Sequence, residues 1–124
     1  MLARDYFPHL LLDLENCNSD DLGDQKFVSD LLSNIAKQIG MRIILGPHVI
    51  AYNGQELEAQ GITGFLVLAE SHISIHTFSN VGYVYLDIFS CKQFDVEKAK
   101  AFIINALKPD KYHEDIKFRQ SIYS

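Results

Sequence analysis

Residues 69–78 read AESHISIHTF, and polar and apolar side chains alternate after the first pair. Ile73 and Ile75 share one parity, while the other parity is polar, with His72, Ser74 and His76. Because successive side chains of a β-strand point to opposite faces, this pattern predicts a strand with one apolar and one polar face. A polar face with two histidines and a serine, directly after Glu70 and Ser71, requires an explanation of its own.

The stretch belongs to a longer run, GITGFLVLAESHISIHTF at residues 61–78. Typical strands contain about 5 to 6 residues, so we expect a break, and the best position is Ala69 to Ser71, where the alternation falters. Residues 79–82, SNVG, have the composition of a turn, and YVYLDIFSC at 83–91 returns as a strand. The two flanking strands are therefore predicted to form an antiparallel hairpin.

Further strands and two helices are expected on either side of this hairpin. Strands are predicted at 9–17 and 41–52, with an edge strand in the tail 111–124, and the polar segment NSDDLGD (18–24) is predicted to be a loop. Apolar residues at helical spacing predict amphipathic helices over 24–39 and from Asp95 to just before Pro109. Two helices among about six antiparallel strands indicate an α+β fold, a two-layer sandwich with both helices on one face of the sheet.

Parity assigns the hairpin side chains to the two faces of this sheet. The apolar set expected beneath the helices comprises Ile73, Ile75, Val84, Leu86 and Ile88. The opposite face collects the polar and aromatic set His72, Ser74, His76, Tyr83, Tyr85, Asp87, Phe89 and Cys91. An uncovered aromatic face usually marks an interface, and a second copy of the same face is its simplest cover. We therefore expect a homodimer that forms through this face.

Length and composition predict a single domain over residues 1–124, because a chain of 124 residues can bury a substantial core without disulfides. The net charge of −5, without any long basic run, makes nucleic acid an unexpected partner. No segment approaches the ~20 apolar residues of a membrane-spanning helix, and no signal peptide is evident, so a cytoplasmic location is expected. Cys17 and Cys91 are then expected to be unpaired thiols.

Two kinds of chemistry could involve the histidines, a metal site and a nucleophilic pair. His72 and His76 would lie ~13 Å apart along a strand, which is too far for two imidazoles to share one zinc ion, and no metal site is expected. Cys91 and His76 lie on the same predicted face and could form a nucleophilic pair. The alternative is that Cys91 is a small, inert thiol.

Glu70 and Ser71 suggest a different reaction. A serine at a strained chain reversal can attack the carbonyl carbon of the preceding peptide bond through its hydroxyl and convert that bond into an ester. Elimination and hydrolysis then leave a pyruvoyl group in place of the serine. This self-processing needs a proton acceptor nearby, a task that suits a histidine.

The stretches AESHISIHTF (69–78) and GYVYLDIFSC (82–91) resemble the short, prokaryotic-type S-adenosylmethionine decarboxylase proenzymes. The typical pattern of that family is Glu-Ser-His, a strand that ends in His-Thr, Gly-Tyr, then Asp, an apolar pair and Thr/Ser-Cys. Order and spacing agree across residues 61–91. The order strand, helix, strands, helix agrees more weakly over about residues 8–108.

The resemblance implies self-cleavage between Glu70 and Ser71, which gives chains 1–70 and 71–124 and a pyruvoyl group made from Ser71. It implies that His76 is the proton acceptor of processing, with Thr63 in support, and that Cys91 is the proton donor in decarboxylation. The pyruvoyl ketone would form a Schiff base with the substrate amine and act as the electron sink. Members of the family are dimers whose sheets face one another.

The activity implied is conversion of S-adenosylmethionine to decarboxylated S-adenosylmethionine, the aminopropyl donor for spermidine synthesis in polyamine biosynthesis. Phe78 and Asn80 are the expected substrate-binding residues, although Asn80 stands where the family usually has an acidic residue. No stacking residue could be assigned within 48–61. Two alternatives stay open: a pyruvoyl decarboxylase of arginine or ornithine, and an uncleaved, non-enzymatic homologue with a structural or regulatory role.

Overall fold

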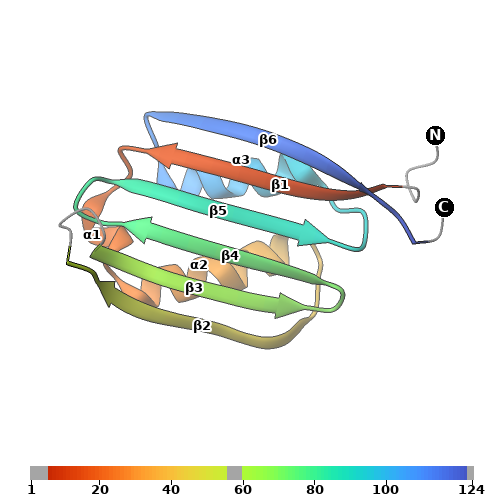
Figure 1. The fold of residues 1–124 in the computed structure, drawn as a ribbon, viewed down its shortest axis with the longest axis horizontal. Helices are drawn as coiled ribbons and strands as arrows, with labels where there is room; N and C mark the ends of the chain where they lie inside the picture. The colour runs from red at the N-terminus through yellow and green to blue at the C-terminus, as the bar shows by residue number, and fades with distance from the viewer. Residues whose placement is uncertain (1–5, 56–59, 123–124) are drawn as a thin grey trace.

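A single antiparallel sheet forms one layer of the protein, and helices cover one of its faces (Figure 1). The computed structural model describes residues 6–55 and 60–122. The strands are β1 (Tyr6–Glu15), β2 (Ile43–Asn53), β3 (Gln60–Leu68), β4 (Ser71–Phe78), β5 (Tyr83–Ser90) and β6 (Lys111–Gln120). The helices are α1 (Ser19–Leu22), α2 (Gln25–Gln38) and α3 (Val96–Leu107). The strand order β2-β3-β4-β5-β1-β6, with all pairs antiparallel, confirms the predicted α+β two-layer fold.

The helices begin where the sequence provides capping side chains. Asp24 accepts hydrogen bonds from the backbone N–H groups of Lys26 and Phe27, and Asp95 accepts one from Lys98, so each satisfies donors that the first turn leaves free. One element was not expected. The predicted loop at 18–24 contains the short helix α1, which Asn18 caps by accepting a hydrogen bond from the backbone N–H of Asp21.

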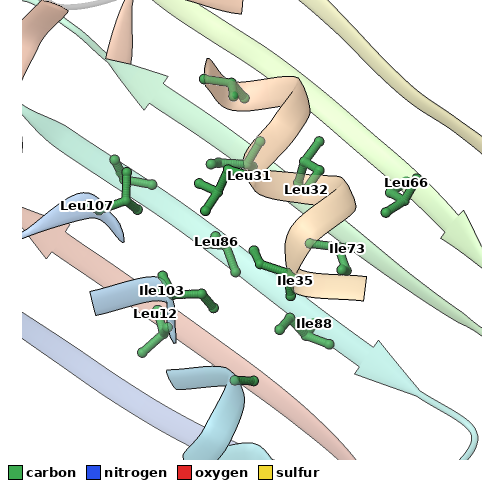
Figure 2. Close-up of a cluster of buried hydrophobic side chains, with 14 of the residues drawn as sticks. Leu12, Leu31, Leu32, Ile35, Leu66, Ile73, Leu86, Ile88, Ile103 and Leu107 are labelled. Atoms are coloured by element: carbon green, nitrogen blue, oxygen red, sulfur yellow. The ribbon is translucent and has the colours of Figure 1, made fainter. Parts of the chain in front are cut away.

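The core lies between the sheet and the two long helices. Figure 2 shows side chains of α2 and α3 directed toward those of the central strands, and all of the labelled residues are buried. The five residues predicted to lie beneath the helices are at most 1% exposed: Ile73, Ile75, Val84, Leu86 and Ile88. Burial of a Leu or Ile side chain contributes about 1.5–3 kcal/mol, so this layer is the main source of stability.

The opposite face of the sheet is not covered by any element within residues 6–55 and 60–122 (Figure 1). Large side chains on it are exposed to solvent, among them Phe65 at 43%, Tyr85 at 46% and Tyr52 at 56%. The uncovered aromatic face expected from the sequence is confirmed, whereas dimerisation through it stays a prediction. None of the described helices is long and apolar enough to cross a membrane.

The predicted break in the run 61–78 is a tight hairpin between β3 and β4. Leu68 pairs with Ser71, which leaves Ala69 and Glu70 as the turn. Glu70 has a φ of 68°, which lies in the left-handed region that residues with a Cβ rarely adopt. The chain reversal expected at the Glu70–Ser71 bond is therefore present, and it holds Glu70 in a costly conformation.

Candidate active site

The peptide bond between Glu70 and Ser71 lies beside the end of β5. The carbonyl oxygen of Glu70 accepts a hydrogen bond from the backbone N–H of Cys91, with a nitrogen–oxygen distance of 2.8 Å. This contact fixes the direction of the carbonyl and draws electron density toward its oxygen. It brings the backbone of Cys91 next to the predicted cleavage site.

Ser71 is the first residue of β4 and is 7% exposed. Its parity is that of Ile73, so its side chain lies on the face that the helices cover. The Ser71 hydroxyl donates a hydrogen bond to Oγ of Ser90, its register partner on β5, at 2.9 Å. The candidate nucleophile is therefore held in a buried position, where an unsatisfied hydroxyl would be costly.

His76 and Thr63 form a second group, on the uncovered face. They are register partners on β4 and β3, and Oγ1 of Thr63 lies 3.1 Å from Nδ1 of His76. A hydroxyl at this distance restricts the orientation of the imidazole ring and leaves its other nitrogen, Nε2, directed elsewhere. The pairing expected between Thr63 and His76 is thus present in the geometry.

The two groups lie at opposite ends of β4 (Figure 1). His76 lies five positions after Ser71, which corresponds to roughly 16 Å along a strand at ~3.3 Å per residue. Their side chains also lie on opposite faces, because Ser71 is buried under the helices and His76 is exposed. One copy of the chain therefore does not bring its own His76 to its own Ser71.

The same separation overturns the suggested Cys91–His76 nucleophilic pair within one chain. His76 pairs with Tyr85 in the β4–β5 register, and Cys91 follows six residues later, so the two side chains are roughly 20 Å apart. Cys91 lies just beyond the end of β5, so its predicted place on the same face as His76 stays a prediction. Proximity was wrong, because the register of the hairpin places the two residues at opposite ends.

A cavity of about 180 Å³ lies at the His76 end of the sheet. Its lining comprises Tyr52, Gly61, Thr63, His76, Thr77 and Phe78. Phe78 was predicted to bind substrate, whereas Tyr52 comes from the segment 48–61, in which no stacking residue could be assigned. Within that segment, residues 56–59 lie outside the described part of the chain. In the sequence, the only indication for Tyr52 was that it is an aromatic residue in a predicted strand, at a position that faces the uncovered side of the sheet.

Asn80, the other predicted substrate residue, lies in the turn that follows β4. Its side-chain amide donates a hydrogen bond to Oε1 of Gln60 at 2.8 Å, and it is outside the lining of the cavity. The turn directly follows Phe78, which lines the cavity. Its amide currently stabilises the start of β3.

The two cysteines differ in environment, and both are free thiols. Cys17 is buried, and burial together with the nearby Asp110 carboxylate raises the pKa of its thiol to about 11. A thiol with such a pKa is inert near neutral pH. Cys91 is half-buried beside the predicted cleavage site, so part of the residue is exposed to solvent. The described residues contain no group of three or more His, Cys, Asp or Glu side chains that could hold a metal ion.

Comparison with known proteins identifies relatives over most of the chain. The model of the S-adenosylmethionine decarboxylase family matches residues 8–120. An S-adenosylmethionine decarboxylase proenzyme from Methanococcus vannielii is 39% identical over 104 residues, which cover 83% of this chain and 80% of the relative. One from Thermodesulfovibrio yellowstonii is 37% identical and covers 81% of this chain and 70% of the relative.

A solved structure has the same fold. The crystal structure of the adenosylmethionine decarboxylase from Aquifex aeolicus superposes with a TM-score of 0.80, at 26% sequence identity. The superposition covers 97% of this chain and 95% of that one. The arrangement of sheet and helices is therefore shared along nearly the whole chain.

Proposed function

Because the chain belongs to the S-adenosylmethionine decarboxylase family, we propose that it is a self-processing, pyruvoyl-dependent enzyme that decarboxylates S-adenosylmethionine for spermidine synthesis. The observation that carries this proposal is the Glu70–Ser71 junction. There, a serine follows a residue in the left-handed conformation, and the carbonyl between them is held by the N–H of Cys91. The proenzyme names of the relatives also support cleavage.

In the first step, Oγ of Ser71 attacks the carbonyl carbon of Glu70. The peptide C–N bond breaks, the serine nitrogen takes up the hydroxyl proton, and an ester joins Glu70 to Oγ of Ser71. As the carbonyl oxygen gains negative charge, the N–H of Cys91 is already directed at it from 2.8 Å in the ground state. Relief of the left-handed conformation at Glu70 also favours breaking this bond, which contributes about 1–3 kcal/mol.

In the second step, a base removes the Hα proton of Ser71. The electron pair forms a double bond between Cα and Cβ, and Oγ leaves with Glu70 as its carboxylate. The resulting dehydroalanine shifts to an imine, and water hydrolyses the imine with release of ammonia, which leaves the pyruvoyl group at position 71. We assign the base to His76, whose Nδ1 is engaged by Thr63.

The junction suits formation of this group, because the precursor residue and its attacking hydroxyl belong to the chain itself. Once formed, the pyruvoyl carbonyl supplies the electron sink for loss of carbon dioxide. Cys91 lies beside it through the contact with Glu70, and its half-buried thiol is assigned to protonate the substrate carbon after decarboxylation.

We further propose that the enzyme works as a homodimer in which His76 of one copy serves the junction of the other. The support is the separation of roughly 16 Å between Ser71 and His76 in one chain, together with the exposed aromatic face. The cavity of about 180 Å³ is smaller than the roughly 300–1,000 Å³ of usual ligand sites, so a second copy would complete it. Tyr52 and Phe78 would then contact the adenine ring of the substrate.

A mixing experiment tests the dimer directly. The Ser71→Ala and His76→Ala variants are co-expressed with different tags, and chain cleavage is followed by intact mass. We expect cleavage of the His76→Ala chain only when the Ser71→Ala chain is present, because that chain supplies an intact His76. If the His76→Ala chain stays whole in every mixed dimer, the assignment of His76 to the opposite copy is wrong.

The substrate is tested by release of labelled carbon dioxide. S-adenosylmethionine, arginine and ornithine, each labelled at the carboxyl carbon, are given separately to the processed enzyme, with Ser71→Ala as the blank. Release from S-adenosylmethionine alone is expected. Release only from a basic amino acid would overturn the substrate, and no release from a cleaved protein would overturn the activity. A cytoplasmic location stays a prediction.

A further inference from the structure

We infer that Ser90 is a positioning residue for self-processing. Its hydroxyl oxygen accepts a hydrogen bond from Ser71, which directs the Ser71 proton toward Ser90 and leaves the Ser71 oxygen free to attack the carbonyl carbon of Glu70. The inference rests on the proposed function, because it concerns the first step of that reaction. The contact that supports it has no role in the reaction steps described above. The hydroxyl of Ser71 donates to Oγ of Ser90 at 2.9 Å.

Ser90 is the last residue of β5 and is fully buried. Its hydroxyl oxygen has three neighbours with hydrogen-bonding capacity. It accepts hydrogen bonds from Ser71 at 2.9 Å and from the backbone N–H of Lys92 at 2.8 Å, and it lies 4.0 Å from the sulfur of Met41. A hydroxyl has one proton and two lone pairs, so these three contacts use its whole capacity.

The partners of Ser90 determine the direction of the hydrogen bond from Ser71. The N–H of Lys92 can only donate, and the thioether sulfur of Met41 can only accept. The Ser90 proton is therefore directed at Met41, and one lone pair is taken by Lys92. The remaining lone pair accepts the proton of Ser71.

This direction matters for the attack on Glu70. A serine oxygen reacts through a lone pair, and the lone pair must face the carbonyl carbon while the O–H bond points elsewhere. Because its proton is directed at Ser90, the O–H bond of Ser71 is held in one direction before any base acts. Met41 and Lys92 cannot remove the proton from Ser90, so the role of Ser90 is orientation and not acid–base transfer.

Ser90 and Cys91 together hold both reacting groups. The side chain of Ser90 holds the nucleophile, and the backbone N–H of its neighbour Cys91 holds the carbonyl oxygen of Glu70. Both anchors lie at the end of one strand, so the relative position of the nucleophile and the carbonyl depends on a single rigid element. Such pre-orientation lowers the cost of bringing the groups together in the transition state.

The alternative is that the Ser71–Ser90 contact only satisfies two buried hydroxyl groups. The two roles predict different kinetics. A purely stabilising contact would alter the melting temperature and affect cleavage only through the fraction of folded chain. An orienting contact would alter the rate of ester formation in chains that remain folded.

The test follows cleavage by intact mass after synthesis in a cell-free system, so that the precursor is observed from its first minutes. Ser90→Ala removes the acceptor, and Ser90→Thr keeps it. We expect Ser90→Ala to slow cleavage about 10- to 100-fold and Ser90→Thr to restore the rate to within about 3-fold. Ile103→Val, a core truncation on α3, is the matched control that lowers the melting temperature without touching the junction.

A second measurement isolates the first step. In a His76→Ala background, hydroxylamine added at intervals cleaves whatever ester has formed between Glu70 and Ser71, and the Ser90→Ala change should slow the appearance of this cleavable form. Equal rates for wild-type and Ser90→Ala chains, or an equal slowing by Ile103→Val, would overturn the inference alone. A wild-type chain that never cleaves would overturn the proposed function and the inference with it.

Discussion

Replacement of Thr77 by valine should destabilise the protein strongly, although the two side chains have nearly the same shape. Thr77 is 3% exposed and lies between His76 and Phe78 on β4. Its hydroxyl donates a hydrogen bond to the carbonyl of Leu22 at 2.7 Å and accepts one from the N–H of Ile62 at 2.8 Å. The hydrogen bonds of this one side chain therefore connect α1 and β3 to β4, the strand that carries His76.

The magnitude follows from the two groups that valine leaves without a partner. Each buried backbone group that loses its hydrogen bond costs about 1–3 kcal/mol, so the two groups together predict a loss of about 2–6 kcal/mol in the free energy of unfolding. For 124 residues, the average unfolding entropy converts this loss into a fall of roughly 8–23 °C in melting temperature. Valine fills the same volume, so a cavity does not contribute.

The assay is thermal unfolding at one protein concentration in the Ser71→Ala background, which keeps every chain uncleaved. Thr77→Ser is the matched control, because it keeps the hydroxyl and loses only a methyl group, at a cost of about 1 kcal/mol. We expect valine to be the more damaging change. A valine variant that melts within about 2 °C of its parent would refute the assignment of these two hydrogen bonds.

Two further predictions concern Gly61 and Cys17. A Cβ at Gly61 would lie 1.8 Å from the carbonyl oxygen of Thr77, so Gly61→Ala should lower the melting temperature more than Thr77→Val does. Gly23→Ala is the control and should change the melting temperature little, because its new Cβ would have its nearest contact at 3.7 Å. Equal effects of the two glycine substitutions would contradict the packing. Because burial raises the pKa of the Cys17 thiol to about 11, only about one thiol in a thousand is ionised at pH 8, and iodoacetamide should label Cys17 only after unfolding. Labelling of Cys17 in the folded protein as fast as a free thiol would contradict its burial.

Local patterns in the sequence predicted most of the fold correctly. The alternation through Ile73 and Ile75 identified the buried face, and Asp24 and Asp95 marked the starts of the long helices. These features depend on neighbouring residues alone. The helix α1 was missed because one turn is too short to show helical periodicity, although Asn18 in the capping position was an available signal.

The candidate site was predicted residue by residue but not as an arrangement. Cys91 and His76 have the same predicted parity, but parity alone does not show that two side chains are close. The turn after Phe78 pairs that residue with Tyr83, and counting onward from this pair would have placed His76 opposite Tyr85, far from Cys91. Register, and not parity, determines which side chains meet along a hairpin.

The contacts at the junction could not be predicted from the sequence. The N–H of Cys91 reaches the carbonyl of Glu70 only because β5 extends alongside the β3–β4 turn. Ser90 stands at the Thr/Ser position of the family pattern, but only the β4–β5 register shows that its hydroxyl contacts Ser71. Backbone geometry supplied both contacts.

The central claim is self-cleavage at the Glu70–Ser71 bond, and the intact mass of the purified protein tests it most directly. The full chain has a mass of 14.1 kDa. After prolonged incubation, the account predicts two chains, residues 1–70 and residues 71–124, the second beginning with a pyruvoyl group, while Ser71→Ala remains whole. A single wild-type species at the full mass would contradict the account.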